Sequence, residues 1–191
     1  MINKLATYTF TPNEQKAIKE LLHYCNGKTI ESARILKNDK DITDKFIIKE
    51  SEYRNSMDPR GEVLPCHESN CPLFNLVKRK LHFKDSTYIH FHPRSLPLSF
   101  GDVLTAFIYR MKKIVAVSAD GKFSIFIPNP HSKVPRKELY AGNEKLSKLI
   151  REQGEGYILD NPTNFKNYKQ AMHMFWQNLA ERTDSKYISD M

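Results

Sequence analysis

The chain has 191 residues, a hydrophobic content of 40% and a formal net charge of +8 at pH 7. This length fits one domain, and the hydrophobic content is enough for a core, which excludes a wholly disordered chain. No apolar run approaches the roughly 18 residues of a membrane span, and the first residues lack the apolar stretch of a signal peptide. We therefore expect a cytoplasmic protein with no membrane partner.

The basic charge indicates an acidic partner, either nucleic acid or the acidic face of another protein. Lysines are scattered along the chain, so we favour a generally solvated basic surface and rank nucleic acid second. Three cysteines and no secretory signal argue against disulfides. Cys66, His67 and Cys71 offer three soft ligands but lack the second pair of a usual zinc site, so we interpret them as ordinary side chains.

A helix is expected from Pro12 to Cys25. Thr11-Pro12 is typical of a helix start, and Asn26-Gly27 of a helix end. Apolar side chains recur at helical spacing and predict one buried face, comprising Ile18, Leu21, Leu22 and Cys25.

Two strands joined by a polar turn are expected next, at residues 29–37 and 46–49. Glu31 lies near the start of the first of these strands. Residues 50–70 are polar and predict mostly irregular structure, and residues 72–83 predict a second helix with one apolar face.

Two histidines mark the end of the next expected strand, residues 87–92. His90 and His92 are two residues apart, so in a strand their side chains project from the same face. Pro93 cannot donate to a ladder and should end the strand.

A helix is expected to follow, with Ser99 as its N-cap and Asp102 in its first turn, extending to Lys112. Two imidazoles at a strand end and one carboxylate at a helix start can converge on one point. Three protein ligands with an open position for water are the arrangement of a catalytic zinc ion. Alternatively, Ser99 and Asp102 only cap the helix, and both histidines are core residues.

The remaining elements are a hairpin and two helices. Asp120-Gly121 predicts the hairpin turn between strands 114–118 and 122–128. Helices are expected at residues 143–153 and 162–181, and residues beyond Arg182 are expected to fray. The order of elements predicts an α/β fold in which helices pack on a sheet. We divide the chain into a domain of residues 1–130 and a C-terminal helical extension of residues 131–191.

His90-x-His92-Pro93 followed by Ser99-x-x-Asp102 resembles the JAMM motif of the JAB/MPN metalloproteases. Six residues separate His92 from Ser99, one fewer than is usual in that family. The family also has a glutamate in the strand after its first helix, and Glu31 takes that place. Arg34 stands where the family has a small residue.

The resemblance implies a central mixed β-sheet flanked by helices and a Zn²⁺ ion bound by His90, His92 and Asp102. It implies that Glu31 is the general base and that Ser99 donates to the oxyanion. Glu50, Glu52 and Glu62 are the competing candidates for the base.

The activity that the resemblance implies is an isopeptidase or peptidase that cleaves after the C-terminus of a ubiquitin-like protein. The expected partners are that protein or its conjugate and other proteins of a conjugation pathway, as in bacterial antiphage systems. The alternatives are a DNA-repair-associated JAB-like domain, which the basic charge allows, and a JAB/MPN interaction module without catalysis. The resemblance covers roughly residues 10–128.

Overall fold

The structure, a computed structural model, describes residues 8–27, 30–43, 51–52, 83–93, 95–133, 135, 137–141, 144 and 162–191. The side chains of residues 30, 31, 51, 52 and 162–168 are not part of this description. The expected strand at 46–49, nearly all of the helices expected at 72–83 and 143–153, and Cys66, His67 and Cys71 lie outside the described residues.

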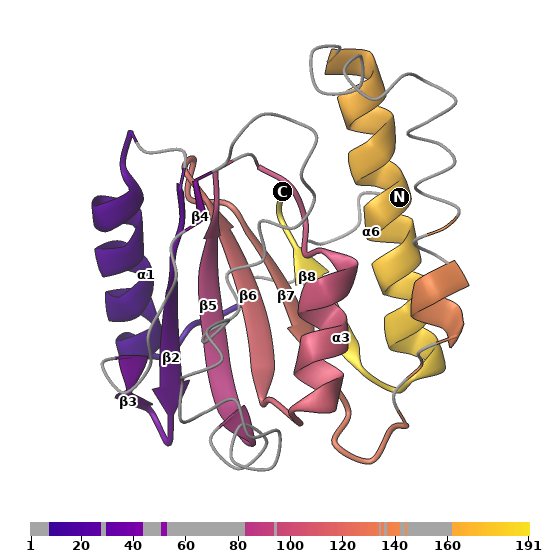
Figure 1. The fold of residues 1–191 in the computed structure, drawn as a ribbon, viewed down its shortest axis with the longest axis horizontal. Helices are drawn as coiled ribbons and strands as arrows, with labels where there is room; N and C mark the ends of the chain where they lie inside the picture. The colour runs from indigo at the N-terminus through magenta and orange to yellow at the C-terminus, as the bar shows by residue number, and fades with distance from the viewer. Residues whose placement is uncertain are drawn as a thin grey trace.

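The protein has a mixed α/β fold built on a six-stranded mixed sheet (Figure 1). In order across the sheet, the strands are β3 (Lys40–Asp41), β2 (Ala33–Lys37), β5 (Ser86–His92), β6 (Lys113–Ser118), β7 (Phe123–Ile127) and β8 (Lys186–Ser189). Of these neighbours, β5 and β6 pair in parallel and the others pair antiparallel. The predicted fold class is therefore confirmed at this level.

The strand expected at residues 29–37 is divided at Ser32. Its first part, β1 (Ile30–Glu31), pairs with β4 (Ser51–Glu52) in a separate two-stranded sheet. Its second part, β2, pairs with β5. One predicted strand thus belongs to two sheets.

Helix α1 (Pro12–Cys25) begins and ends where the sequence predicts. The Thr11 side chain accepts a hydrogen bond from the Glu14 backbone, and the Glu14 carboxylate accepts one from the Thr11 backbone at 3.1 Å. This reciprocal capping box satisfies two backbone donors that the first helical turn leaves without intrahelical partners. Gly27, with a φ of +70°, takes the left-handed conformation just past the end.

Helix α3 (Phe100–Ile108) begins at the predicted cap but ends four residues earlier than Lys112. Arg110 has a φ of +52°, and the backbone N–H groups of Arg110 and Met111 donate to the carbonyls of Phe107 and Ala106. These two bonds form a Schellman motif, which closes the helix although its apolar spacing continues to Met111.

The C-terminal part of the chain packs on this sheet. Helix α6 (Pro162–Arg182) confirms the helix predicted for residues 162–181. The expectation that residues beyond Arg182 fray is wrong, because β8 pairs with β7 along four residues, from Lys186 with Ile127 to Ser189 with Ser124. Its backbone hydrogen bonds are made to a strand about sixty positions earlier, which no local pattern in the sequence reveals.

Helices cover both faces of the sheet (Figure 1). On one face, α3 and α6 bury a cluster that includes Tyr88, Val103, Phe126 and Trp176. On the other face, α1 buries Leu21 and Cys25 against Ile89, Phe91 and Val115. The described aromatic side chains of α6, Phe175 and Trp176, therefore pack in or against the core.

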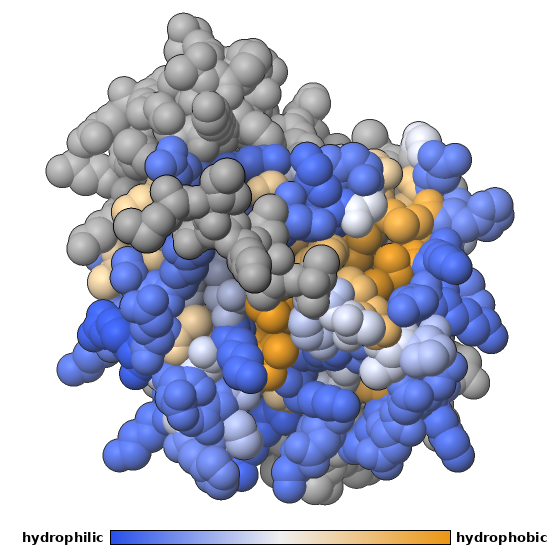
Figure 2. Space-filling view, turned by 180° about the vertical axis from the view of Figure 1, so that it is seen from behind, coloured by the Kyte–Doolittle hydropathy of each residue, from blue (hydrophilic) through white to orange (hydrophobic). Residues whose placement is uncertain are grey.

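The surface seen from behind is mostly hydrophilic, with apolar patches between the polar side chains (Figure 2). Among the described residues, the large hydrophobic side chains that are exposed are Tyr24, Tyr140 and Met174. No described helix is long and apolar enough to cross a membrane.

A buried ion pair joins α1 to the sheet. Lys113 Nζ lies 2.7 Å from both carboxylate oxygens of Glu14, and both side chains are about 5% exposed or less. Thr87 Oγ1 also donates to Glu14 Oε1 at 3.4 Å, and Lys113 Nζ donates to the Tyr8 hydroxyl. Removal of one partner would leave a buried charge without compensation, which is strongly destabilising.

We expect Glu14→Gln to lower the free energy of unfolding by about 3 kcal/mol or more, because Lys113 loses its counter-charge while the shape of the side chain is kept. Urea unfolding followed by circular dichroism measures this. The control is Glu20→Gln on the same helix, whose pair with Lys16 is exposed and 3.9 Å long; we expect a change within about 0.5 kcal/mol. Equal effects of the two substitutions would contradict the assigned role of the pair.

Candidate metal centre

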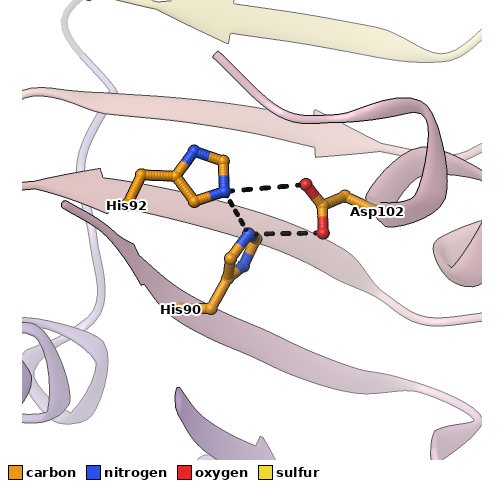
Figure 3. Close-up of side chains that lie close together, drawn as sticks. All are labelled: His90, His92 and Asp102. Carbon is orange, nitrogen blue, oxygen red and sulfur yellow. Dashed lines mark hydrogen bonds and ion pairs between the residues drawn. The ribbon is translucent and has the colours of Figure 1, made fainter. Parts of the chain in front are cut away.

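His90 and His92 lie at the end of β5, on the face that α3 covers. Both side chains are buried, and their Nε2 atoms are 2.9 Å apart (Figure 3). The strand ends at His92, as expected from Pro93. The predicted projection of the two imidazoles from one face of the strand is thus confirmed.

Asp102 approaches the two histidines from the first turn of α3 (Figure 3). Its Oδ1 lies 3.3 Å from His90 Nε2, and its Oδ2 lies 3.7 Å from His92 Nε2. The same carboxylate caps the helix, because the Ser99 backbone N–H donates to Oδ2 at 2.7 Å. The Asp102 backbone N–H donates to Ser99 Oγ at 3.1 Å. Capping and convergence with the histidines therefore occur together and are not alternatives.

The path of the chain brings the three side chains to one place. Parallel neighbours such as β5 and β6 need a crossover connection, and α3 is that connection. Seven residues separate His92, the last residue of β5, from Phe100, the first residue of α3, so the start of the helix lies beside the strand end it has just left.

His90, His92 and Asp102 could hold a metal ion, since each offers one ligand atom and these atoms lie within 4.8 Å of one another. The three side chains form a triangle: the two Nε2 atoms are 2.9 Å apart, and the Asp102 oxygens lie 3.3 Å from His90 Nε2 and 3.7 Å from His92 Nε2. Bonds of about 2.0–2.1 Å at a tetrahedral angle put two ligand atoms about 3.3 Å apart, as around zinc. The observed triangle has that size, so it can form one face of a tetrahedral site.

The protonation states of two residues in this triangle also suit a cation. Burial and the neighbouring His90 lower the pKa of His92 to about 4, against smaller opposing effects of Asp102 and the Leu96 backbone. Burial alone would raise the pKa of Asp102, but His90, His92 and the Ser99 N–H hold that pKa well below its usual range. At neutral pH, His92 is therefore a neutral imidazole and Asp102 a carboxylate.

A loop carbonyl orients His92. His92 Nδ1 lies 2.8 Å from the Leu96 carbonyl oxygen, and because a carbonyl only accepts, Nδ1 must carry the proton. Nε2 is then the lone-pair atom that faces His90 and Asp102. Such an outer partner fixes the tautomer and orientation of a metal-binding histidine. Leu96 could not be identified from the sequence, because any residue type offers the same backbone carbonyl.

Glu31 and Ser99 are the residues that the resemblance assigned to catalysis. Ser99 is half-buried and lies at the cap beside Asp102. Glu31 is described by its backbone: Ala33 pairs with His90, and the Ser32 carbonyl accepts from the Phe91 N–H at 2.9 Å. The pairing of β2 with β5 stops at Ala33, and Glu31 belongs to β1, where its backbone pairs with Ser51 of β4. Glu52 is in β4, paired with Ile30, while Glu50 and Glu62 lie outside the described residues.

Comparisons of the chain with protein-family models, with curated proteins and with solved structures found no match.

We expect the protein, once stripped of metal by a chelator, to bind about one equivalent of a divalent ion, and Asp102→Asn to weaken that binding at least tenfold. The amide keeps the shape of the side chain but removes the charge that attracts a cation, and ligand softness and charge set metal affinity. Isothermal titration calorimetry measures both proteins. Asp120→Asn is the control, since Asp120 lies in the exposed turn after β6 and pairs with Lys122 at 3.4 Å. Equal affinity of wild type and Asp102→Asn would exclude Asp102 as a ligand.

Proposed function

We propose that the protein is a zinc-dependent isopeptidase or peptidase of the JAB/MPN type, which cleaves after the C-terminus of a ubiquitin-like protein. The observation that carries this proposal is the triangle of His90, His92 and Asp102, whose edges of 2.9–3.7 Å suit a tetrahedral ion. Two imidazoles and one carboxylate are also a ligand set that leaves a fourth position open, as catalytic zinc sites do.

The arrangement of the fold supports the proposal further. Helix α1 precedes the strand that contains Glu31, His90 and His92 end a strand of a mixed sheet, and Ser99 and Asp102 start the following helix. This is the order that the resemblance to the JAMM motif implies. The short motif and its position at the end of β5 and the start of α3 support a metal-dependent hydrolase. The substrate class comes from the resemblance to the JAMM motif.

The proposed reaction is hydrolysis of an amide. A water oxygen adds to the carbonyl carbon, the carbon–nitrogen bond breaks, and the amine leaves with one proton taken from that water. When bound, zinc supplies a Lewis acid that polarises the carbonyl and lowers the pKa of water. Glu31 is assigned the proton transfer, because a carboxylate beside the reacting water can accept the proton and pass it to the amine.

Ser99 is assigned the hydrogen bond to the developing oxyanion. Its Oγ accepts from the Asp102 N–H at the helix cap, but a hydroxyl that accepts still has its own hydrogen to donate. A donor fixed by a helix cap is preorganised, which is the condition under which such a bond lowers the barrier most.

We expect Glu31→Ala to lower the cleavage rate by about 10²- to 10⁴-fold while zinc remains bound, because a positioned general base contributes that much. The assay uses ubiquitin-like proteins joined through their C-terminus to a reporter, with and without a chelator, and zinc content is measured by atomic emission. The matched variants are Glu50→Ala, Glu52→Ala and Glu62→Ala. If Glu31→Ala cleaves normally and one of these variants loses cleavage, the acid replaced in that variant is the general base.

We expect Ser99→Ala to lower kcat by about 10²-fold with little change in KM, since the oxyanion forms only in the transition state. Loss of the cap should also lower the free energy of unfolding by about 1 kcal/mol. Thr11→Ala is the control, because Thr11 has the same capping-box role on α1; it should show the loss in stability without the loss in kcat. If both variants keep full activity, Ser99 serves only as a cap.

The two alternative functions predict different zinc contents and different DNA binding for the purified protein. A JAB/MPN interaction module without catalysis would contain less than about half an equivalent of zinc. A DNA-repair-associated domain would bind DNA with an affinity that falls steeply as salt rises, because phosphate contacts release counterions. Chelator-sensitive cleavage of a ubiquitin-like fusion is the outcome that our proposal requires.

A further inference from the structure

Leu98, in the loop between β5 and α3, is held by its backbone from two directions. Its carbonyl accepts a hydrogen bond from Trp176 Nε1 of α6 at 2.8 Å. Its N–H donates to the Ser124 hydroxyl of β7 at 3.4 Å. Leu98 and Trp176 are fully buried, so water cannot replace these bonds. Two distant parts of the chain therefore fix one loop residue.

This residue lies between the groups that orient two of the metal-site ligands. Two positions before it, the Leu96 carbonyl lies 2.8 Å from His92 Nδ1. One position after it, Ser99 forms the capping box with Asp102. A shift of Leu98 would consequently move both the carbonyl that orients His92 and the cap that orients Asp102.

Aromatic contacts of α6 hold the start of α3 as well. The ring of Phe100, the first residue of α3, lies 4.9 Å from the ring of Trp176 and 5.0 Å from that of Phe175, measured between centroids. Asp102 follows in the same helical turn. Trp176 thus contacts both the loop, through Nε1, and the helix start, through its ring.

We propose that Trp176 is a positioning residue of the metal centre, and that it sets metal affinity by fixing the loop 96–99 and with it His92 and Asp102. This inference rests on the proposed metal binding. Trp176 donates to the Leu98 carbonyl and packs its ring against Phe100, so its effect on the centre acts through these two residues. Helix α6, which the sequence analysis assigned to a separate extension, is then part of the site.

The expected size of the effect follows from outer partners of metal ligands, whose removal typically weakens metal binding by about 10- to 100-fold. Trp176→Phe keeps an aromatic ring against Phe100 but removes the only donor that the tryptophan side chain has. The buried Leu98 carbonyl then lacks that donor, and the loop can relax away from its position.

The test measures Zn²⁺ affinity by competition with a chromophoric chelator, and the visible absorption of the Co²⁺-substituted protein, which reports ligand geometry. We expect Trp176→Phe to bind Zn²⁺ about 10- to 100-fold more weakly and to have an altered Co²⁺ spectrum. The control is Leu179→Ala, which removes a buried side chain of the same helix but keeps the tryptophan that donates to the Leu98 carbonyl. It should be less stable to urea but bind Zn²⁺ within a factor of about three of wild type.

Ser124→Ala provides a second route, should Trp176→Phe fail to fold. It removes the acceptor for the Leu98 N–H, the second of the two bonds that hold Leu98, so we again expect weaker Zn²⁺ binding. Unchanged affinity in the folded variants, or an equal loss in Leu179→Ala, would overturn the inference while leaving the metal centre intact. A wild-type protein that binds no Zn²⁺ would overturn the metal centre itself and this inference with it.

Discussion

The structure of the site depends on one topological constraint, the parallel pairing of β5 and β6. A parallel neighbour cannot be reached by a tight turn, so the chain must return through α3 before it enters β6. The beginning of that helix therefore lies over the end of the strand it follows. His90 and His92 are at the strand end and Asp102 is in the first helical turn, so convergence of the three side chains follows from the crossover.

The electrostatics of the site follow from this placement. His92 is removed from water next to a second imidazole, which favours its neutral form. Asp102 is also buried, but His90 and the Ser99 N–H stabilise its charged form. A neutral nitrogen and a negative oxygen are thus held a few ångströms apart at neutral pH, and a cation can bind them without first displacing a proton from either.

The parts of this arrangement that the sequence predicted are those set by short-range patterns. The alternation of β5 places His90 and His92 on one face, and Ser99-x-x-Asp102 is a capping box wherever a helix starts. The Asp120-Gly121 turn likewise fixes the hairpin of β6 and β7, and Gly121 has the expected positive φ of +78°.

The features that were missed depend on distant contacts. The division of the first strand at Ser32, the strand β8 and the hold of Trp176 on Leu98 all involve partners far away in the chain. The early end of α3 has a local cause, the left-handed backbone conformation of Arg110. Arginine rarely adopts this conformation, so the residue type does not predict it. A tryptophan in an apolar stripe predicts burial, but its N–H donor has a partner only once the fold is known.

The capping box also bears on how metal binding and folding are related. A carboxylate buried near two imidazoles would be costly if it depended on a cation for every interaction, because an uncompensated buried charge is destabilising. Here Asp102 Oδ2 accepts the Ser99 N–H, and that bond forms with the helix itself. Leu96 and Trp176 hold His92 and the loop by bonds that likewise belong to the folded chain. The geometry of the three side chains is therefore a product of folding and does not depend on a bound cation.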